Sequence, residues 1–327
     1  MEDSSQVSAA NSNQPVGEPR GYYGLPVLKR PIWGWEVWSY FFLGGIAAGS
    51  FVVASLALWF GERDDRPIVR SGFLISAAAI LACPPLLIKD LGRPARFLNM
   101  LRVAKPQSPM SLGIWGLLGF SACVFPLALK QLLAKNTLVS RMIPERFLAT
   151  VGSVLGCFVG GYTGVLLSTT SVPIWSRSRF LGPSFLASGF SAALSAISLV
   201  LTLGRAISDP SIRKLERIER VALAGEAVAI AGYLAETSWA ARPLLEPKQH
   251  GRAFLGGAIF LGIILPGLAS LSSEPRGRGS IVISSLAAIL GSIFLRYSIV
   301  AGGRASADDP EIYFRHSEGA TGGASPS

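Results

Sequence analysis

Long apolar segments, each near twenty residues and separated by charged connectors, recur along this sequence. About 20 residues of α-helix, rising 1.5 Å each, cross a hydrocarbon core of about 30 Å. Half of the 327 residues are apolar and only 15% are charged, whereas about a quarter of the residues of a soluble domain are charged. The sequence therefore predicts an all-α, polytopic membrane helix bundle.

Eight segments are predicted to span the membrane. They are residues 35–60, 68–88, 112–133, 147–168, 184–204, 218–240, 253–272 and 280–300. The sixth is the least apolar, because it contains Glu226 and Glu236. Residues 35–300 are thus predicted to form one membrane domain, after a polar tail and interfacial segment at 1–34. A Gly- and Ser-rich tail at 301–327 is predicted to be disordered.

The distribution of basic residues predicts the orientation. Lys and Arg are denser in the connectors after the first, third, fifth and seventh spans than elsewhere. Basic residues concentrated in short loops favour the cytoplasm. With an even number of spans, both termini are therefore predicted to face outward, to the periplasmic side of a bacterial inner membrane. The connector between the second and third spans is also basic, as expected of a loop that a partner protein covers.

The cysteines and histidines argue against a metal ion or a haem held by this chain. Cys83, Cys123 and Cys157 lie in apolar segments without C-x-x-C spacing, whereas iron–sulfur clusters and structural zinc need several suitably spaced ligands. His250 and His316 lie outside the apolar segments, where a membrane cytochrome would not hold haem. The net charge of +10 falls mainly between the spans, which indicates membrane lipids rather than nucleic acid as its partner.

The stretch from Ile80 to Trp115 is the most distinctive part of the chain. It reads ILACPPLLIKDLGRPARFLNMLRVAKPQSPMSLGIW. The succession K-D-L-G-R-P, R-F, M-L and P-x-S-P-M-S, before a tryptophan-bearing segment, resembles a loop of the NrfD/PsrC family. That loop joins the second and third transmembrane helices of these quinone-handling membrane subunits of iron–sulfur molybdoenzymes. The resemblance covers all eight predicted helices, and its specific motifs lie in residues 35–49, 80–115 and 160–175.

Polar residues inside the first span form a candidate site. Glu36 and Tyr40 are four residues apart and so share a helix face. Ionisable groups at membrane depth are costly and usually face a cavity, the bundle interior or each other. A run of small residues, Gly44–Gly49, follows, where another helix or a flat ligand could approach closely. The resembled family carries a quinone-contacting polar pair here, an amide and an imidazole. The alternative is that Glu36 and Tyr40 are anchors among lipid head groups.

A second candidate lies in the fourth span. Tyr162 belongs to Y-T-G-x-L-L-S, which is followed by V-P-x-W. This motif is similar to one in the family whose tyrosine lies at the quinone pocket, and the glycines around Tyr162 are expected to leave room for a ring. The resemblance therefore implies a quinone site made by Glu36, Tyr40 and Tyr162, with Glu36 as the catalytic base. Alternatively, Tyr162 hydrogen-bonds a neighbouring helix.

The resemblance also implies the function and the partners. The chain would exchange two electrons and two protons with menaquinone or ubiquinone, passing the electrons to or from a four-cluster ferredoxin-like iron–sulfur subunit. That subunit would connect to a molybdopterin-type catalytic subunit, so this chain would not act on the terminal substrate alone. The predicted docking surface comprises Lys89, Asp90, Arg93, Arg96 and Arg102.

Three charged residues in the later spans leave alternatives open. Glu226, Glu236 and Arg296 could form a proton route or a structural ion pair. A secondary transporter would also fit the helix count and the buried carboxylates, although no inverted repeat is evident. A passive membrane anchor is the third interpretation, and the polar residues Glu36, Tyr40 and Tyr162 make it less favourable.

Overall fold

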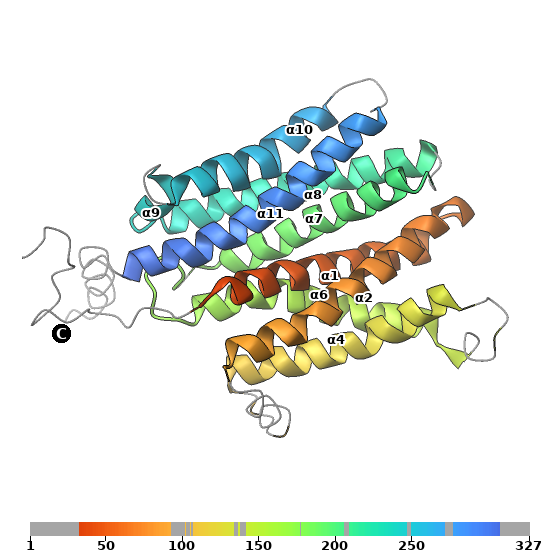
Figure 1. Cartoon of the computed structure of the whole chain (residues 1–327), viewed down its shortest axis with the longest axis horizontal. Helices are drawn as coiled ribbons and strands as arrows, with labels where there is room; N and C mark the ends of the chain where they lie inside the picture. Colours follow the sequence, from red (N-terminus) through yellow and green to blue (C-terminus); the bar gives the residue numbers. More distant parts are fainter. Residues whose placement is uncertain are drawn as a thin grey trace, which may run out of the picture.

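The structure is a bundle of long helices packed side by side along a common direction (Figure 1). This computed structural model describes residues 33–92, 102, 105, 107–133, 137, 142–176, 178–205, 209–246, 250–271 and 277–307. Within these ranges the regular secondary structure is helical, with no strand. Arg93 and Arg96, two residues of the predicted docking surface, lie outside the described residues.

The long helices follow the predicted apolar segments closely. They are α1 (Trp35–Phe60), α2 (Arg66–Asp90), α4 (Pro109–Leu132), α6 (Glu145–Ser168), α7 (Leu181–Leu203), α8 (Asp209–Glu236) and α11 (Arg278–Ala307). A π-helix, η3 (Arg252–Ile264), continues directly into α10 (Leu265–Ser270). Two short helices, η2 (Arg63–Asp65) and α9 (Arg242–Leu245), lie in connectors.

Among the described residues, seven helical segments are long and apolar enough to cross a membrane. They are Trp35–Phe60, Arg63–Asp90, Pro109–Leu132, Glu145–Ser168, Leu181–Leu203, Arg252–Ser270 and Arg278–Ala307. The predicted sixth span is not among them, although α8 lies alongside α7 within the bundle (Figure 1). The all-helical membrane bundle is thus confirmed, while an eighth crossing and the outward orientation stay predictions.

Helix α8 begins at Asp209 rather than at the predicted position 218. Its first half is amphipathic: Leu215 and Glu219 are buried, whereas Arg213 and Arg217 are exposed. Hydropathy detects only an apolar segment, so it finds the second half of such a helix and not the first. The earlier start of α8 therefore depends on tertiary packing, because α7 covers one face of α8.

Helix α11 continues to Ala307, past the predicted end of the membrane domain at residue 300. The close packing of Gly302 and Gly303 explains the extension, because a Cβ atom on either would clash, with Leu244 and with the Trp175 ring respectively. Trp175 also donates a hydrogen bond from Nε1 to the Ile299 carbonyl at 2.7 Å. The first part of the predicted tail is thus helical, and the rest of it lies outside the described residues.

The small-residue run of α1 packs against helix α7. A Cβ atom on Gly49 would lie 2.8 Å from the Gly189 carbonyl oxygen of α7. A Cβ atom on Gly189 would in turn lie 2.9 Å from the carbonyl oxygen of Gly45. The two backbones therefore meet directly, as small residues allow in membrane bundles.

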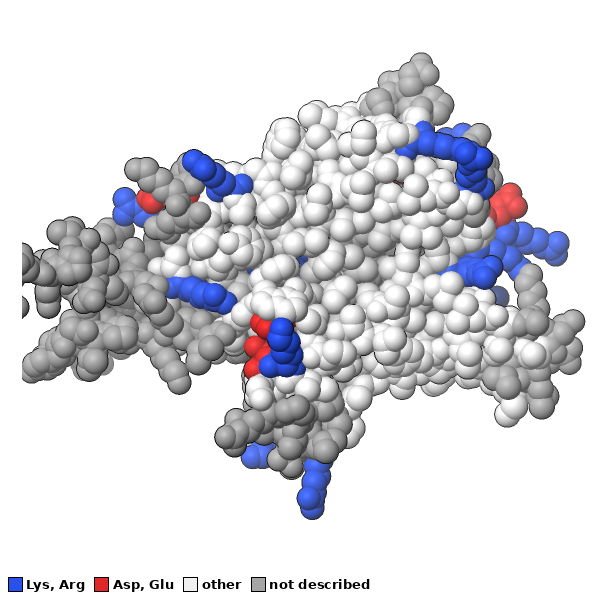
Figure 2. Space-filling model, viewed as in Figure 1, with Lys and Arg blue, Asp and Glu red and all other residues white. Residues whose placement is uncertain are grey.

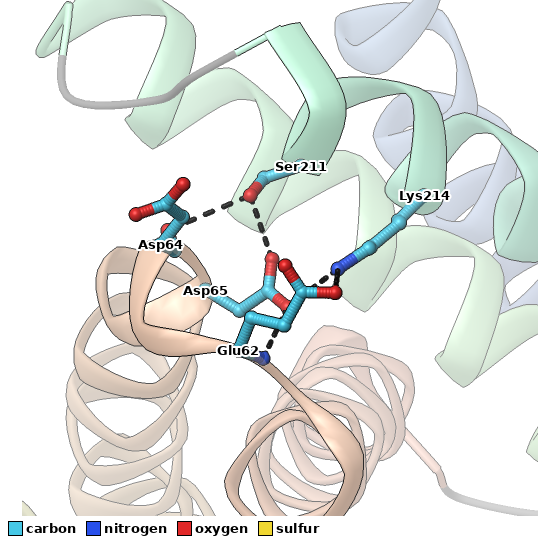
Figure 3. Close-up of polar contacts among 5 residues, drawn as sticks. All are labelled: Glu62, Asp64, Asp65, Ser211 and Lys214. Carbon is cyan, nitrogen blue, oxygen red and sulfur yellow. Dashed lines mark hydrogen bonds and ion pairs between the residues drawn. The ribbon is translucent and has the colours of Figure 1, made fainter.

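Four polar residues hold the start of α8 against the connector between α1 and α2 (Figure 3). We call this cluster of Glu62, Asp65, Ser211 and Lys214 the α8 clasp. The buried Asp65 carboxylate accepts hydrogen bonds from the Ser211 hydroxyl at 2.6 Å, from Lys214 at 3.1 Å and from the Glu62 backbone N–H at 2.9 Å. Lys214 also pairs with Glu62 at 3.3 Å. The clasp thus fixes the least apolar long helix at one end.

Charged side chains gather toward the two ends of the bundle on the face shown in Figure 2, and a broad middle belt is almost free of them. Such a belt is what a hydrocarbon core requires. Helix α1 begins and α11 finishes at the same end of the bundle (Figure 1). We call this the terminal end, and the other the opposite end.

Candidate functional site

A cavity at the terminal end is lined by four helices, three of which contribute polar side chains. It lies between the start of α1, the end of α2, the start of α4 and the end of α6, and has a volume of about 100 Å³. One water molecule needs about a tenth of this space. The polar side chains in its lining are Glu36, Tyr40, Asp90 and Tyr162. The predicted trio from the first and fourth spans therefore shares one site.

Most of the cavity wall is apolar. Val37 and Phe41 come from α1, Leu86 and Leu87 from α2, and Leu117 from α4. This combination of apolar walls with a few polar groups is typical of pockets that bind small, largely apolar molecules.

Glu36 lies in the first turn of α1, where a helix favours a negative charge. Its carboxylate forms an ion pair with Lys89 at 3.2 Å, and its side chain is 16% exposed. The Lys89 ammonium also lies over the Trp35 ring, 4.2 Å from its centre. Glu36 is therefore a charge-balanced acceptor that water can still reach.

Tyr40 lies one helical turn deeper and is 8% exposed. Its hydroxyl has no hydrogen-bond partner within the part of the chain that the structure describes. Buried hydroxyl groups usually have a partner, because an unsatisfied one costs free energy. The Tyr40 hydroxyl can therefore donate a hydrogen bond to an acceptor atom of a ligand in this cavity.

Tyr162 already uses its proton, because its hydroxyl donates a hydrogen bond to the Pro109 carbonyl at the start of α4. The oxygen keeps a free lone pair, so toward a ligand Tyr162 can act as an acceptor. The sequence left open the alternative that Tyr162 hydrogen-bonds a neighbouring helix, and this bond to α4 is such a contact. It leaves Tyr162 in the cavity wall all the same.

The space for the Tyr162 ring comes from Gly113 of α4, where a Cβ atom would clash with that ring. The glycines of its own helix serve another purpose. A Cβ atom on Gly164 would lie 2.7 Å from Gly182, and one on Gly160 would lie 2.9 Å from Leu186, both on α7. The expectation that these glycines make room for a ring was therefore wrong, since they pack α6 against α7.

Three residues of the predicted docking surface are described. Lys89 and Asp90 end helix α2 beside the cavity, where Lys89 pairs with Glu36 and Asp90 lines the wall. Arg102 is exposed in the connector between α2 and α4. This connector leaves the bundle at Gly92 and returns at Ser108, both at the terminal end (Figure 1). The cavity and the connector are therefore neighbours.

Arg296 and the two glutamates of α8 do not share one site. Arg296 is fully buried and donates hydrogen bonds to the Phe41 and Phe185 carbonyls at 3.2 and 3.0 Å. It also bonds the Ser188 and Ser292 hydroxyls, at 3.2 and 2.6 Å. Its side chain thereby joins α1, α7 and α11.

Glu226 is buried against α7, within hydrogen-bonding reach of Ser188 and Ser191. Ser188 thus contacts both Glu226 and Arg296, and no direct ion pair joins these two among the described residues. Glu236 instead accepts hydrogen bonds at the terminal end, from Ser178 at 3.1 Å and the Arg179 backbone at 2.8 Å.

The sequence missed several residues that shape these sites. Gly113 and the buried Glu219, whose carboxylate accepts a hydrogen bond from Ser195 at 3.0 Å, had no distinguishing motif. The helical spacing of Glu219 and Glu226, seven residues apart, could have indicated a shared buried face. No group of three or more metal-ligating side chains occurs among the described residues.

Fold and site together define the class: a polytopic membrane protein with a polar cavity at one end of its helix bundle. The chain belongs to the NrfD family, whose model, described as "Polysulphide reductase, NrfD", matches residues 27–307.

Named relatives match over most of their lengths. The C subunit of the polysulfide reductase of Wolinella succinogenes is 28% identical over 306 residues, covering 84% of this chain and 94% of the relative. Protein NrfD of Escherichia coli is 25% identical, covering 84% and 95%. The NrfD homologue of Haemophilus influenzae is 24% identical, covering 84% and 94%. The family resemblance found in the sequence is therefore confirmed.

Proposed function

We propose that this chain is the quinone-binding membrane subunit of a respiratory oxidoreductase complex in a bacterial inner membrane. The observation that carries the proposal is the convergence of Glu36, Tyr40 and Tyr162 on one cavity. The proposal agrees with the names of the relatives, one of which is a single subunit of a polysulfide reductase. A passive anchor would have no need of a carboxylate and two tyrosines gathered in the wall of one cavity.

A quinol delivers two electrons and two protons when it is oxidised to the quinone, and the reverse reaction consumes them. The Tyr40 hydroxyl would donate a hydrogen bond to a carbonyl oxygen of the ring. The Glu36 carboxylate would accept a proton from a ring hydroxyl and release it to water through its exposed edge. Lys89 would keep Glu36 ionised by pairing with it, and Tyr162 would accept a hydrogen bond from a ring hydroxyl.

The electrons need another carrier, which we propose to be an iron–sulfur subunit docked on the connector between α2 and α4. Electron transfer slows steeply with distance, so a quinone must bind near the partner's cluster. The cavity lies where that connector leaves and rejoins the bundle. We propose Arg93, Arg96 and Arg102 as the charges that hold this partner, which would connect in turn to a molybdopterin-type catalytic subunit.

The test measures quinol oxidation, or quinone reduction, by membranes that contain the assembled complex, together with titration of a quinone-analogue inhibitor. Tyr40→Phe should weaken inhibitor binding about fivefold to tenfold, since one hydrogen bond contributes about 1 kcal/mol. Tyr162→Phe should weaken it less, because that hydroxyl donates to Pro109. Glu36→Gln should lower turnover more than affinity, because the amide keeps the size and loses the base.

Two matched variants control for nonspecific effects. Tyr297→Phe removes a hydroxyl from α11, where the ring packs edge-on against Trp38 outside the cavity. Glu246→Gln neutralises a carboxylate that pairs with Arg242 and does not line the cavity. Both should behave like the parent. If Tyr40→Phe and Glu36→Gln also assemble and match the parent in rate and inhibitor affinity, the quinone site lies elsewhere.

A further inference from the structure

A second and much larger cavity lies at the opposite end of the bundle. It has a volume of about 1000 Å³. Its lining comes from the last turn of α1, the start of α2, the end of α4, the start of α6 and the end of α7. None of its residues lines the first cavity.

The lining of this cavity contains both basic and apolar side chains. Arg66, Arg70 and Lys130 are its cations, and Glu145 is the carboxylate in its lining. The ion pair between Lys130 and Glu145, at 2.8 Å, neutralises one charge of each sign. Three cations less one carboxylate leave a net charge of +2 on the lining.

The two arginines carry this net charge. Arg66 and Arg70 are four residues apart at the start of α2, so they share one face of that helix. Both are exposed, and neither has a carboxylate partner among the described residues. Their guanidinium groups are therefore available to an anion, and a guanidinium fork matches phosphate oxygens well.

Much of the remaining lining is aliphatic. It includes Leu58, Leu74, Leu132 and Val200, and Leu132 is 65% exposed although it is a large apolar residue. The helices whose ends meet here are membrane-crossing candidates, so the cavity lies near the boundary between the apolar middle and the charged end of the bundle. A free phosphate or a soluble metabolite would leave this aliphatic wall without a partner.

From this combination we infer a binding site for one anionic phospholipid, such as phosphatidylglycerol. Its phosphate would bind Arg66 and Arg70, while its acyl chains would cover Leu58, Leu132 and Val200. Basic pockets between membrane helices bind anionic head groups in this way. Because α1, α2, α4, α6 and α7 all contribute, the lipid would fill the gap between their ends.

The experiment uses the full chain, purified in detergent and stripped of lipid, with native mass spectrometry and thermal melting as the readouts. Added phosphatidylglycerol should remain bound at one molecule per chain and raise the melting temperature. Phosphatidylcholine and inorganic phosphate should do neither. At about 1 kcal/mol for each basic residue, Arg66→Gln with Arg70→Gln should weaken phosphatidylglycerol binding roughly 30-fold.

The matched control is Arg213→Gln with Arg217→Gln, which removes the same charge at the same spacing from the exposed face of α8 and should keep the lipid. A second variant, Leu132→Asp, places a carboxylate in the cavity at an exposed position and should also weaken phosphatidylglycerol binding. The inference is overturned if the Arg66/Arg70 variant keeps the lipid, if the control loses it equally, or if phosphatidylcholine binds as well. Stabilisation by inorganic phosphate alone would overturn it too, in favour of a soluble-anion site.

Discussion

At the scale of the residue, the two cavity tyrosines show how position decides chemistry. Tyr40 and Tyr162 both line the cavity, yet only Tyr162 has a hydrogen-bond acceptor in the described protein, the Pro109 carbonyl. A hydroxyl that already donates to a protein acceptor adds little to the free energy of ligand binding. A hydroxyl without an acceptor can donate a new hydrogen bond to the ligand, and that bond adds to the binding free energy. This difference is why we expect Tyr40 to matter more for binding.

Gly113 offers a test at this scale that removes no polar side chain. Gly113→Ala would push the Tyr162 ring into the cavity, because the added methyl group clashes with it. Inhibitor affinity should fall about tenfold or more, with the chain still assembled. Gly119→Ala, on the same helix, is the control, since its Cβ atom would lie 3.3 Å from the flexible end of Leu155. Equal inhibitor affinity in both variants would contradict the assignment of Gly113 to the cavity.

At the scale of the element, α8 shows what holds a helix that hydropathy alone would not place in a membrane bundle. Its carboxylates Glu219 and Glu226 are buried against serines of α7, and its start is fastened by the α8 clasp (Figure 3). Buried polar groups are stable only when hydrogen-bond partners such as these serines satisfy them. The helix is thus held by specific polar contacts as well as by apolar area.

The clasp predicts a stability effect. Ser211→Ala removes a 2.6 Å hydrogen bond to the buried Asp65 carboxylate. It should lower the free energy of unfolding by about 1.5–3 kcal/mol, the usual range for a bond to a charged group. Denaturant unfolding in detergent would measure the change. Ser168→Ala, which removes an exposed hydroxyl bonded only to its own helix, should change it by about 0.5 kcal/mol or less. Equal stability of the two variants would mean that the clasp contributes nothing.

At the scale of the whole molecule, the two cavities lie at opposite ends of one bundle. The proposed quinone site adjoins the α2–α4 connector, and the proposed lipid site adjoins the connectors that are rich in basic residues. If these basic connectors face the cytoplasm, the lipid site lies in the inner leaflet. The quinone site then faces the periplasm, where the iron–sulfur partner would dock.

Topology reporters test this arrangement directly. A reporter that is active only in the cytoplasm should be inactive after Ser327 and active when inserted in the connector between α7 and α8, near Lys214, because basic residues in short loops stay inside. A periplasmic reporter at the same positions is the control and should give the reverse result. Cytoplasmic activity after Ser327 would overturn the orientation and place the proposed quinone site on the inner face. Activity of one reporter at both positions would mean an even number of crossings between them, as expected if α8 does not span and the chain crosses seven times in all.

The sequence by itself determined the class, the family and the apolar segments. It also marked Glu36, Tyr40 and Tyr162, because an ionisable or polar residue within an apolar segment stands out locally. Their convergence on one cavity followed from the family resemblance and not from spacing, since they lie on α1 and α6.

Only the tertiary structure decided what each group contacts. It placed α7 against the Gly44–Gly49 run, gave the Tyr162 proton to Pro109, and surrounded Arg296 with carbonyls and serines. It also extended α8 to Asp209, beyond its apolar half. The physical reason is that hydropathy and helical period describe one helix at a time. A cavity, a hydrogen bond between helices or a buried amphipathic face depends on which neighbour packs against that helix.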